Sequence, residues 1–409
     1  MEEKTFDIKA VEKAAFSFVL LMGIVILFSD MTHEGAASII GAYLSLAGAS
    51  AAAIGFVSGL GEFIGYSLRL VTGWFTDKTK KYWPITIAGY IVDCMAIPAL
   101  ALVPKGGWIW ACLLIMVQRT GKAIKKPAKD TLLSFAASRA GVGKSFAIQE
   151  LLDQIGAFLG PVILFMVMTL KTNEDLFSLY SVCFVILGLP AIITIVLLFM
   201  AMRRYPAPEK FEPAAKETQP FRLNRPFLFY IIAISLFAFG FLNFAIITMH
   251  TAKTGLVPAD TLPLVYAGAM AVDAFAALFF GWLYDKRGIG VLMLSALISA
   301  PFAIFIFLAT ARWALFLGVA LWGVGMGAQE SILKAAVTSI VPKQNRSSGF
   351  GIFQTSFGAC WFLGSWLMGF LYDTSLVWMV VFSVAMQLVS IPFFWMSARA
   401  HYSSANSKI

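Results

Sequence analysis

The sequence has little charge. Only 13% of its 409 residues are Asp, Glu, Lys or Arg, whereas 59% are hydrophobic. Soluble domains carry about a quarter charged residues, so this chain has too little polar surface to cover a water-soluble globule. A mean hydropathy of +0.82 indicates a protein that lies in lipid. The net charge of +9 would suggest nucleic acid as a partner of a soluble protein, but the basic residues follow the membrane topology given below. No nucleic-acid partner is therefore expected.

Cysteine and histidine are also scarce, which limits metal and redox chemistry. There are three histidines and four cysteines, and each cysteine lies in an apolar segment, without the spacing of a metal site or a disulfide framework. The cysteines are expected to be ordinary buried side chains, and no cofactor is expected. If the protein binds a divalent cation, the candidate ligands are Asp30, His33 and Glu34, which share one helical face.

Signatures of processing, ATP hydrolysis and catalysis are missing as well. The first residues, MEEKTFDIKAVEK, are too acidic for a cleaved signal peptide, so the first apolar segment is expected to be retained. No P-loop is present, so ATP is not expected to drive the protein. No nucleophile, base and orienting group occur in a recognisable spacing, so it is not expected to be an enzyme.

Long apolar runs dominate the chain instead. A helix needs about 20 apolar residues to cross the hydrocarbon core of a membrane, and twelve segments meet this need. The chain is therefore expected to be an all-α, multi-pass integral membrane protein, in the plasma (inner) membrane if it is bacterial or archaeal. The expected spans are 13–36, 51–73, 84–103, 108–124, 146–169, 177–201, 227–250, 261–283, 290–310, 313–333, 350–371 and 378–397.

Lysine and arginine are distributed unevenly between the two sides of these spans. Most lie on the side of the termini; Lys105, Lys171, Lys253 and Arg312 lie on the other side, and Arg69 lies within a span. This asymmetry places both termini in the cytoplasm. A proline-rich, charged segment at 202–226 is expected to be a cytoplasmic linker. It would join two six-helix halves, 1–201 and 227–409.

The two halves repeat a short motif. The hexapeptide that begins at Gly73 and the one that begins at Gly281 share Gly, Trp, Asp and Lys at the same positions. Each follows the second span of its half. Parallel repeats of six helices are one plan on which transporters are built.

In this arrangement the chain resembles the major facilitator superfamily. The resemblance implies two pseudo-symmetric bundles of six helices, a monomer in the lipid bilayer, and transport of a small solute by alternating access. It also assigns a cytoplasmic gate to the two motif copies, at Gly73, Asp77, Lys78, Gly281, Asp285 and Lys286.

The fifth span carries a second motif, Gly156-x-x-x-Gly160-Pro161. It resembles part of a family motif associated with exporters, although Leu164 and Phe165 stand where the trailing glycine pair would be. The alternative interpretation is ordinary helix packing with a proline kink.

Ionisable residues within the spans are candidates for function because charge is costly in lipid. Acids outnumber bases there, with Arg69 as the one clear base. The carboxylates could bind a cation or take up protons, or they could hold helices together, for example Glu62 or Asp93 by pairing with Arg69. The candidate residues of a substrate or proton pathway are Asp30, His33, Glu34, Glu62, Tyr66, Arg69, Arg119, Asp153, Gln154, Asn243, Asp273, Glu330 and Gln354.

These features predict a secondary-active transporter of a small solute, coupled to protons, with a preference for export and for a cationic or zwitterionic substrate. An uncoupled facilitator and a divalent-metal transporter are the alternatives within the same class. A membrane sensor or scaffold that moves nothing is the alternative of another class.

Overall fold

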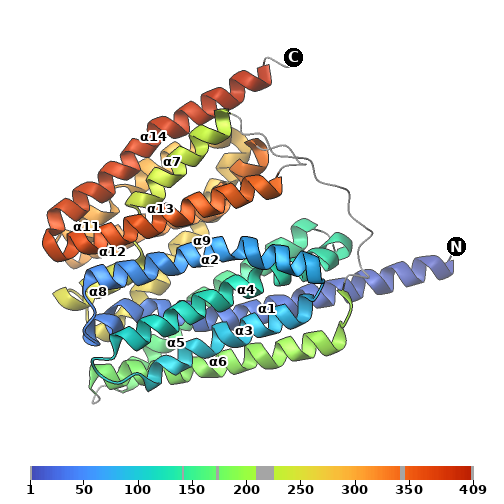
Figure 1. Cartoon of the computed structure of the whole chain (residues 1–409), viewed down its shortest axis with the longest axis horizontal. Coiled ribbons are helices and arrows are strands. Elements are labelled where there is room, and N and C mark those ends of the chain that lie inside the picture. Colours follow the sequence, from blue (N-terminus) through green and yellow to red (C-terminus); the bar gives the residue numbers. More distant parts are fainter. Residues whose placement is uncertain (1, 141, 172–174, 209–224, 341–345, 407–409) are drawn as a thin grey trace. The chain divides into compact units, whose positions relative to one another are not determined.

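A computed structural model describes the chain except for residues 1, 141, 172–174, 209–224, 341–345 and 407–409. The described part is helical and contains no strand (Figure 1). Short 3-10 segments occur at Leu100–Leu102, Ala259–Thr261 and Gly288–Gly290. The helices are α1 (Glu2–Leu46), α2 (Ala51–Thr79), α3 (Tyr82–Ala99), α4 (Trp108–Ala140), α5 (Val142–Leu170), α6 (Leu176–Arg204), α7 (Arg225–Gly240), α8 (Phe244–Thr254), α9 (Leu262–Arg287), α10 (Val291–Ser299), α11 (Phe302–Phe307), α12 (Arg312–Ile340), α13 (Arg346–Thr374) and α14 (Leu376–Asn406).

Each expected span coincides with one helix or with two consecutive helices. Within the described residues, nine segments are long and apolar enough to cross a membrane by length and composition. The spans expected at 108–124, 313–333 and 350–371 correspond to α4, α12 and α13, which are not among these nine segments. The expected all-α membrane fold is confirmed. The cytoplasmic location of the termini stays a prediction.

Two expected spans are interrupted rather than continuous. The span at 227–250 divides into α7 and α8, and Asn243 caps α8 by accepting a hydrogen bond from the backbone N–H of Ala245 at 3.0 Å. The carbonyls freed at the break are satisfied from distant helices: Trp322 donates to Leu242 at 2.9 Å and Ser383 to Gly240 at 2.6 Å. Such partners allow a helix to break within lipid. The span at 290–310 likewise divides at Pro301.

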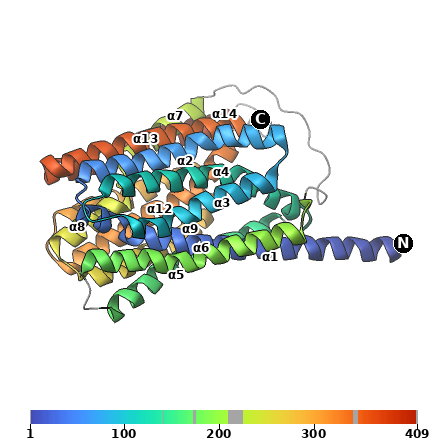
Figure 2. The same ribbon diagram turned by 60° about the horizontal axis from the view of Figure 1, so that its bottom comes forward.

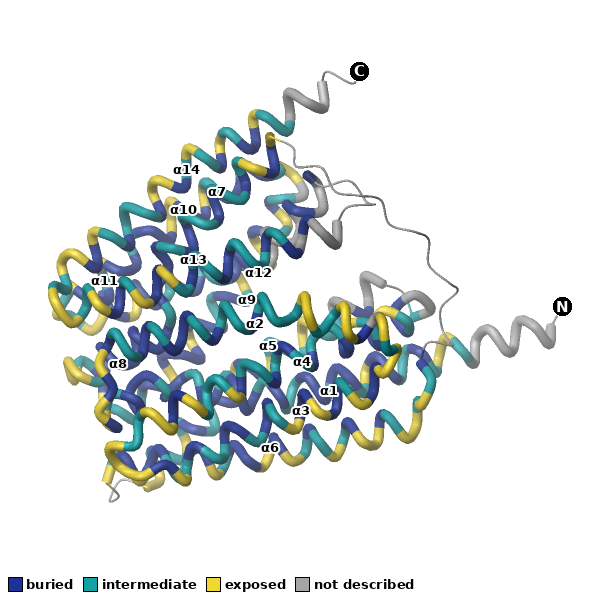
Figure 3. The backbone as a smooth tube through the Cα atoms, in the orientation of Figure 1, coloured by how far each residue is buried: buried dark blue, intermediate teal, exposed yellow. Residues whose placement is uncertain are grey.

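The chain forms two compact units. Unit 1 comprises Met1–Ala37 and Leu68–Lys216, and unit 2 comprises Ser38–Ser67 and Glu217–Ile409. In unit 1, α3 packs against both α4 and α6, and in unit 2, α7 packs against both α13 and α14 (Figures 1 and 2). Buried and exposed residues alternate along these helices (Figure 3). The exposed positions include large apolar side chains such as Leu189 and Trp395, as expected of a surface that faces lipid.

A carboxylate from the end of α13 caps the first turn of α2 within unit 2. The backbone N–H groups of Ala51 and Ala52 donate to the Asp373 carboxylate at 3.2 and 2.8 Å, and Ala53 donates to Ser50 at 3.1 Å. The first N–H groups of a helix have no partner within it, and a negative charge there is also favoured by the helix dipole. Asp373 therefore anchors the start of α2 on α13.

Replacing Asp373 with alanine is expected to cost about 1 kcal/mol of stability, because both accepted hydrogen bonds at the start of α2 are lost. Thermal unfolding of the purified protein in detergent measures this loss. Asp260→Ala is the matched control, since Asp260 accepts a hydrogen bond from its neighbour Thr261 in a short 3-10 segment. Equal midpoints for the two variants would show that the cap contributes nothing.

An exposed ion pair joins the segment after α3 to the start of α6. Lys105 and Asp175 lie 2.8 Å apart, with side chains 66% and 54% exposed. The hydrogen bond from Lys105 holds the pKa of Asp175 below its usual value, so the contact is present at neutral pH and is lost in acid. Exposed pairs contribute little to stability, which makes Asp175 a suitable control for the buried acids described next.

Candidate functional site

Two glycines bring charged residues of α3 and α4 together in unit 1. A Cβ on Gly89 of α3 would lie 2.6 Å from the backbone nitrogen of Lys125, and one on Gly121 of α4 would lie 2.5 Å from that of Asp93. Only glycine permits so close an approach. Each glycine lies one helical turn from the charged residue of its own helix, so the crossing places Asp93 beside Lys125.

The Asp93 carboxylate is the centre of a buried polar cluster. It forms an ion pair with Lys125, and its Oδ1 lies 2.9 Å from Nε2 of His33 and accepts a 2.7 Å hydrogen bond from Gln118. Asp93 is fully buried, and Lys125 is 5% exposed. The Lys125 ammonium also lies 3.9 Å from the centre of the Tyr90 ring. Burial of a charge is tolerated when it is paired and hydrogen-bonded in this way.

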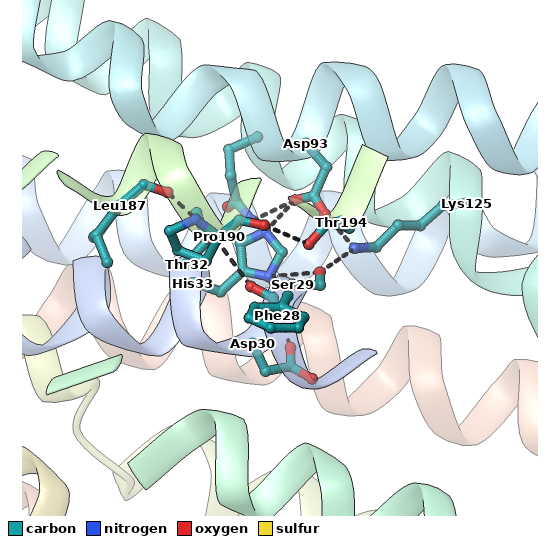
Figure 4. Close-up of polar contacts among 11 residues, drawn as sticks. Phe28, Ser29, Asp30, Thr32, His33, Asp93, Lys125, Leu187, Pro190 and Thr194 are labelled. Carbon is teal, nitrogen blue, oxygen red and sulfur yellow. Dashed lines mark hydrogen bonds and ion pairs between the residues drawn. The ribbon is translucent and has the colours of Figure 1, made fainter. Parts of the chain in front are cut away.

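Ser29 completes a closed ring of contacts around His33 (Figure 4). Lys125 donates to the Ser29 hydroxyl at 3.1 Å, and that hydroxyl lies 3.4 Å from Nδ1 of His33. Starting from Lys125, the ring passes through Ser29, His33 and Asp93 and returns to Lys125. Its members come from α1, α3 and α4, so the ring ties three helices of unit 1 together.

A pair of carboxyl groups lies next to this ring. The carboxyl side chains of Asp30 of α1 and Asp153 of α5 interact with each other. Asp30 also lies 3.7 Å from Nδ1 of His33, and its side chain is 16% exposed. Two neighbouring carboxylates repel each other when both are ionised, and a single proton on one of them relieves this repulsion.

Glycines of α5 explain why the two carboxyl groups meet. A Cβ on Gly156 would lie 3.1 Å from the carbonyl carbon of Leu27, and one on Gly160 would lie 2.9 Å from the nitrogen of Gly35. The motif that resembles part of an exporter signature thus allows α5 to pack tightly on α1. Pro161 follows Gly160 within the same helix.

The cluster also contains a possible metal-ligand set. Within the described residues, ligand atoms of His33, Asp93 and Cys94 lie within 4.8 Å of one another. The expected alternative set of Asp30, His33 and Glu34 does not form such a group. Because the Lys125 ammonium already pairs with Asp93, a metal ion would have to displace a built-in cation, and the residues present do not favour one.

Two expectations about this region are wrong. Asp93 does not pair with Arg69, and Arg69 is not the one base within the spans, because Lys125 is buried in α4.

The fourth span was expected to end at 124, yet α4 continues through Pro127 to Ala140. Proline removes the hydrogen bond to the carbonyl four residues earlier. Here that carbonyl belongs to Ala123. It accepts a 3.0 Å hydrogen bond from the Thr72 hydroxyl of α2 in place of the missing backbone N–H.

The remaining candidate residues of the pathway are distributed over both units. Glu34, Arg69, Arg119 and Gln154 are half-buried in unit 1. In unit 2, Asp273 is buried in α9, and Tyr66 packs edge-on against Phe357 of α13 at 5.6 Å. The side chain of Glu330 lies outside the described part. Glu62, Asn243 and Gln354 are half-buried in unit 2.

The repeated hexapeptide makes the same local contact in both copies. The Lys78 ammonium lies 4.9 Å from the centre of the Trp74 ring, and Lys286 lies 3.8 Å from that of Trp282. Gly73 is in α2 and Gly281 in α9. The side chains of the two acids in the expected gate, Asp77 and Asp285, lie outside the described part. A gating role for the motif stays a prediction.

Comparison with known proteins identifies the family. The model of the Major Facilitator Superfamily matches residues 22–287 and 254–409. The chain belongs to this superfamily of secondary transporters and is a multi-pass integral membrane protein. An uncharacterized protein of Mycobacterium tuberculosis is 36% identical over 387 residues, which cover 92% of each chain. An uncharacterized MFS-type transporter of Methanocaldococcus jannaschii is 25% identical over 87% of this chain and 89% of its own.

Solved structures share the fold at low sequence identity. A nucleoside transporter, NupG, superposes with a TM-score of 0.73 at 14% identity over 92% of this chain and 100% of its own. A D-xylose-proton symporter gives 0.70 at 13% identity over 93% and 97%. A bacterial homolog of the human lysosomal transporter Spinster gives 0.65 at 16% over 95% and 96%. These similarities concern the fold alone.

Proposed function

We propose that this protein is a proton-coupled secondary transporter, and that the Asp30–Asp153 pair is its proton-binding site. The observation that carries the proposal is the close packing of α5 on α1 at Gly156 and Gly160, which brings the side chains of these two acids into interaction. A proton held between two acids within membrane-spanning helices is a group that can load and unload during a transport cycle. The fold of a D-xylose-proton symporter, which this chain shares, is compatible with such coupling.

The charges of the cluster support a choice of substrate class. Lys125 neutralises Asp93, and one shared proton leaves the Asp30–Asp153 pair with a single negative charge. That charge can be neutralised by a second proton or by a positively charged group of the solute. Asp30 is partly exposed and Asp153 is half-buried, so neither carboxyl group is fully enclosed in the core. We therefore favour a cationic or zwitterionic solute.

Competition between proton and solute for one site produces exchange. A proton that binds the pair releases the solute, and a solute that binds releases the proton, provided that the two halves expose the site alternately to each side. With an inward proton gradient this exchange exports the solute.

Proteoliposomes test the proposal. The purified protein is reconstituted with a pH-sensitive dye inside, and a set of organic amines and amino acids is added outside. Entry of a transported solute should drive protons out, so the lumen becomes more alkaline, and a protonophore should abolish accumulation. Solute exchange without a pH change would instead identify an uncoupled facilitator.

A further inference from the structure

An apolar cavity of about 90 Å³ lies between α1, α5 and α6 of unit 1. Its lining belongs to the described residues and contains no polar or charged side chain. Met31 of α1 and Leu187 of α6 are buried at its inner wall, whereas Leu189 of α6 is 64% exposed and lies at its mouth. The cavity therefore extends inward from the exposed surface of α6 toward α1.

Glycine and proline explain why side chains leave this space open. Gly160 of α5 contributes no side chain to the wall. Pro190 lies inside α6 and has no backbone N–H, so it cannot donate to the carbonyl of Ile186, and proline bends a helix at such a position. The Thr32 hydroxyl of α1 reaches the next carbonyl, that of Leu187, at 3.5 Å (Figure 4). This contact holds α6 to α1 at the edge of the cavity.

The cavity lies halfway along the helices that line it. Three lining residues, one from each helix, lie at or next to the middle of their apolar segments: Phe28 in Val11–Leu46, Gly160 in Ile148–Leu170 and Pro190 in Leu176–Arg204. The hydrocarbon core of a membrane is about 30 Å thick, so its middle is roughly 15 Å from either headgroup region. Only the ends of acyl chains lie at that level.

We propose that this cavity binds the end of an acyl chain of a bilayer lipid. Its lining exposes no polar atom to the cavity, whereas a buried water needs about two to four polar partners. Apolar cavities stay dry and accept apolar ligands; one of about 150 Å³ in another protein binds benzene or xenon. The mouth opens on the face of α6 where Val185 and Ile192 are also exposed, as on a surface that faces lipid. Hydrocarbon is therefore the ligand of matching chemistry where the cavity opens.

Van der Waals contact holds the chain in the cavity. A chain that leaves bulk lipid gains no hydrophobic free energy, because lipid tails are as apolar as leucine. Side chains around a void lack partner atoms and forfeit dispersion energy, which an entering chain restores. Binding should therefore depend on shape and depth and not on the lipid headgroup. The chain packs against Phe28 and Met31, on either side of Asp30 in the sequence of α1, and it supports α1 whether or not transport is coupled to protons.

Methionine methyl NMR tests for lipid inside the cavity. The full-length protein is deuterated except for its methionine methyl groups and placed in nanodiscs of phosphatidylcholine with protonated acyl chains, and Met31→Leu assigns the Met31 signal. Met31 is only 8% exposed, so an Overhauser effect between its methyl group and the ends of the acyl chains requires a chain in the cavity. We expect this effect.

Two other methionines are matched controls. Met166 of α5 is 55% exposed and should show an Overhauser effect from bulk lipid, whereas Met22 of α1 is fully buried and should show none. An effect at Met166 without one at Met31 would overturn the proposal.

A filling variant distinguishes the cavity from any other route to Met31. Ile193→Phe adds volume within the lining, and Val196→Phe adds the same volume on the exposed surface of α6 outside it. The first variant should lose most of the effect at Met31, and the second should keep it. Ile163→Phe, which fills the cavity from α5, replaces Ile193→Phe if that variant does not fold. An undiminished effect in a folded filling variant would overturn the proposal.

A change of headgroup completes the test. In nanodiscs of phosphatidylglycerol the effect at Met31 should equal that in phosphatidylcholine, because the cavity lies far from both headgroup regions. An effect in only one of the two lipids would contradict the binding of a chain end.

Discussion

Lys125→Met is expected to cost about 3–5 kcal/mol of stability, because it leaves the Asp93 carboxylate buried without its cation. Asp93 is fully buried between α3 and α4, so water cannot replace the lost ammonium. Asp93→Leu should be similarly destabilising, since it leaves Lys125 without a carboxylate. Thermal unfolding in detergent, with the variants compared at equal protein and detergent concentrations, measures both losses.

The double variant distinguishes pairing from packing. Replacing both partners of a buried ion pair with apolar residues is often neutral or stabilising, so Asp93→Leu/Lys125→Met should recover most of the stability. The double-mutant cycle isolates the interaction between the two residues. Additive losses would mean that the two residues do not act as a pair. Asp175→Asn, in an exposed ion pair, should leave the unfolding midpoint unchanged.

The largest functional effect is expected from Asp153→Asn. Asparagine keeps a hydrogen-bonding side chain beside Asp30 but cannot release a proton. For one proton exchanged per solute, each unit of pH gradient is worth about 1.4 kcal/mol and sustains a roughly tenfold solute gradient. The variant should lose this accumulation, while exchange of labelled for unlabelled solute continues. Uptake and exchange assays in the same proteoliposomes measure the two activities separately.

Asp30→Asn should behave like Asp153→Asn, since either change removes the shared proton. Asp175→Asn serves as the control and should accumulate solute as the wild type does. Full accumulation by the Asp153 variant would contradict the assignment of the pair. Loss of both accumulation and exchange would mean that the remaining carboxylate is not enough to bind the solute.

Much of the fold could be predicted because lipid imposes long apolar helices. The boundaries of the expected span at 177–201 lie within a few residues of those of α6. The start of the expected span at 378–397 lies within a few residues of the start of α14, which continues to Asn406. The break between α7 and α8 could not be predicted, because it depends on side chains such as Trp322 and Ser383, which come from elsewhere in the chain.

The candidate site could be predicted in part. Asp30 and His33 share a helical face, and Asp153 is an acid within a span, so the sequence marks each of them as a candidate. Lys125 was missed because basic residues at a cytoplasmic boundary are common. One available signal was Gly121, which lies one turn before Lys125 and permits a close helix crossing.

Gln118 was missed for a different reason. A glutamine near the start of a basic stretch has no distinctive pattern, and its role depends on a 2.7 Å hydrogen bond to Asp93 on another helix. Which partner a buried polar residue finds is decided by helix packing, and that information lies in three dimensions rather than in spacing along the chain.

Infrared spectroscopy of the protein in lipid bilayers tests the central claim most directly, because it needs no knowledge of the solute. At neutral pH the wild type should show the carbonyl-stretch band of a protonated carboxyl group. Both Asp30→Asn and Asp153→Asn should remove this band, and Asp175→Asn should keep it. A wild-type spectrum without the band, or a band that survives in both variants, would contradict a proton shared between Asp30 and Asp153.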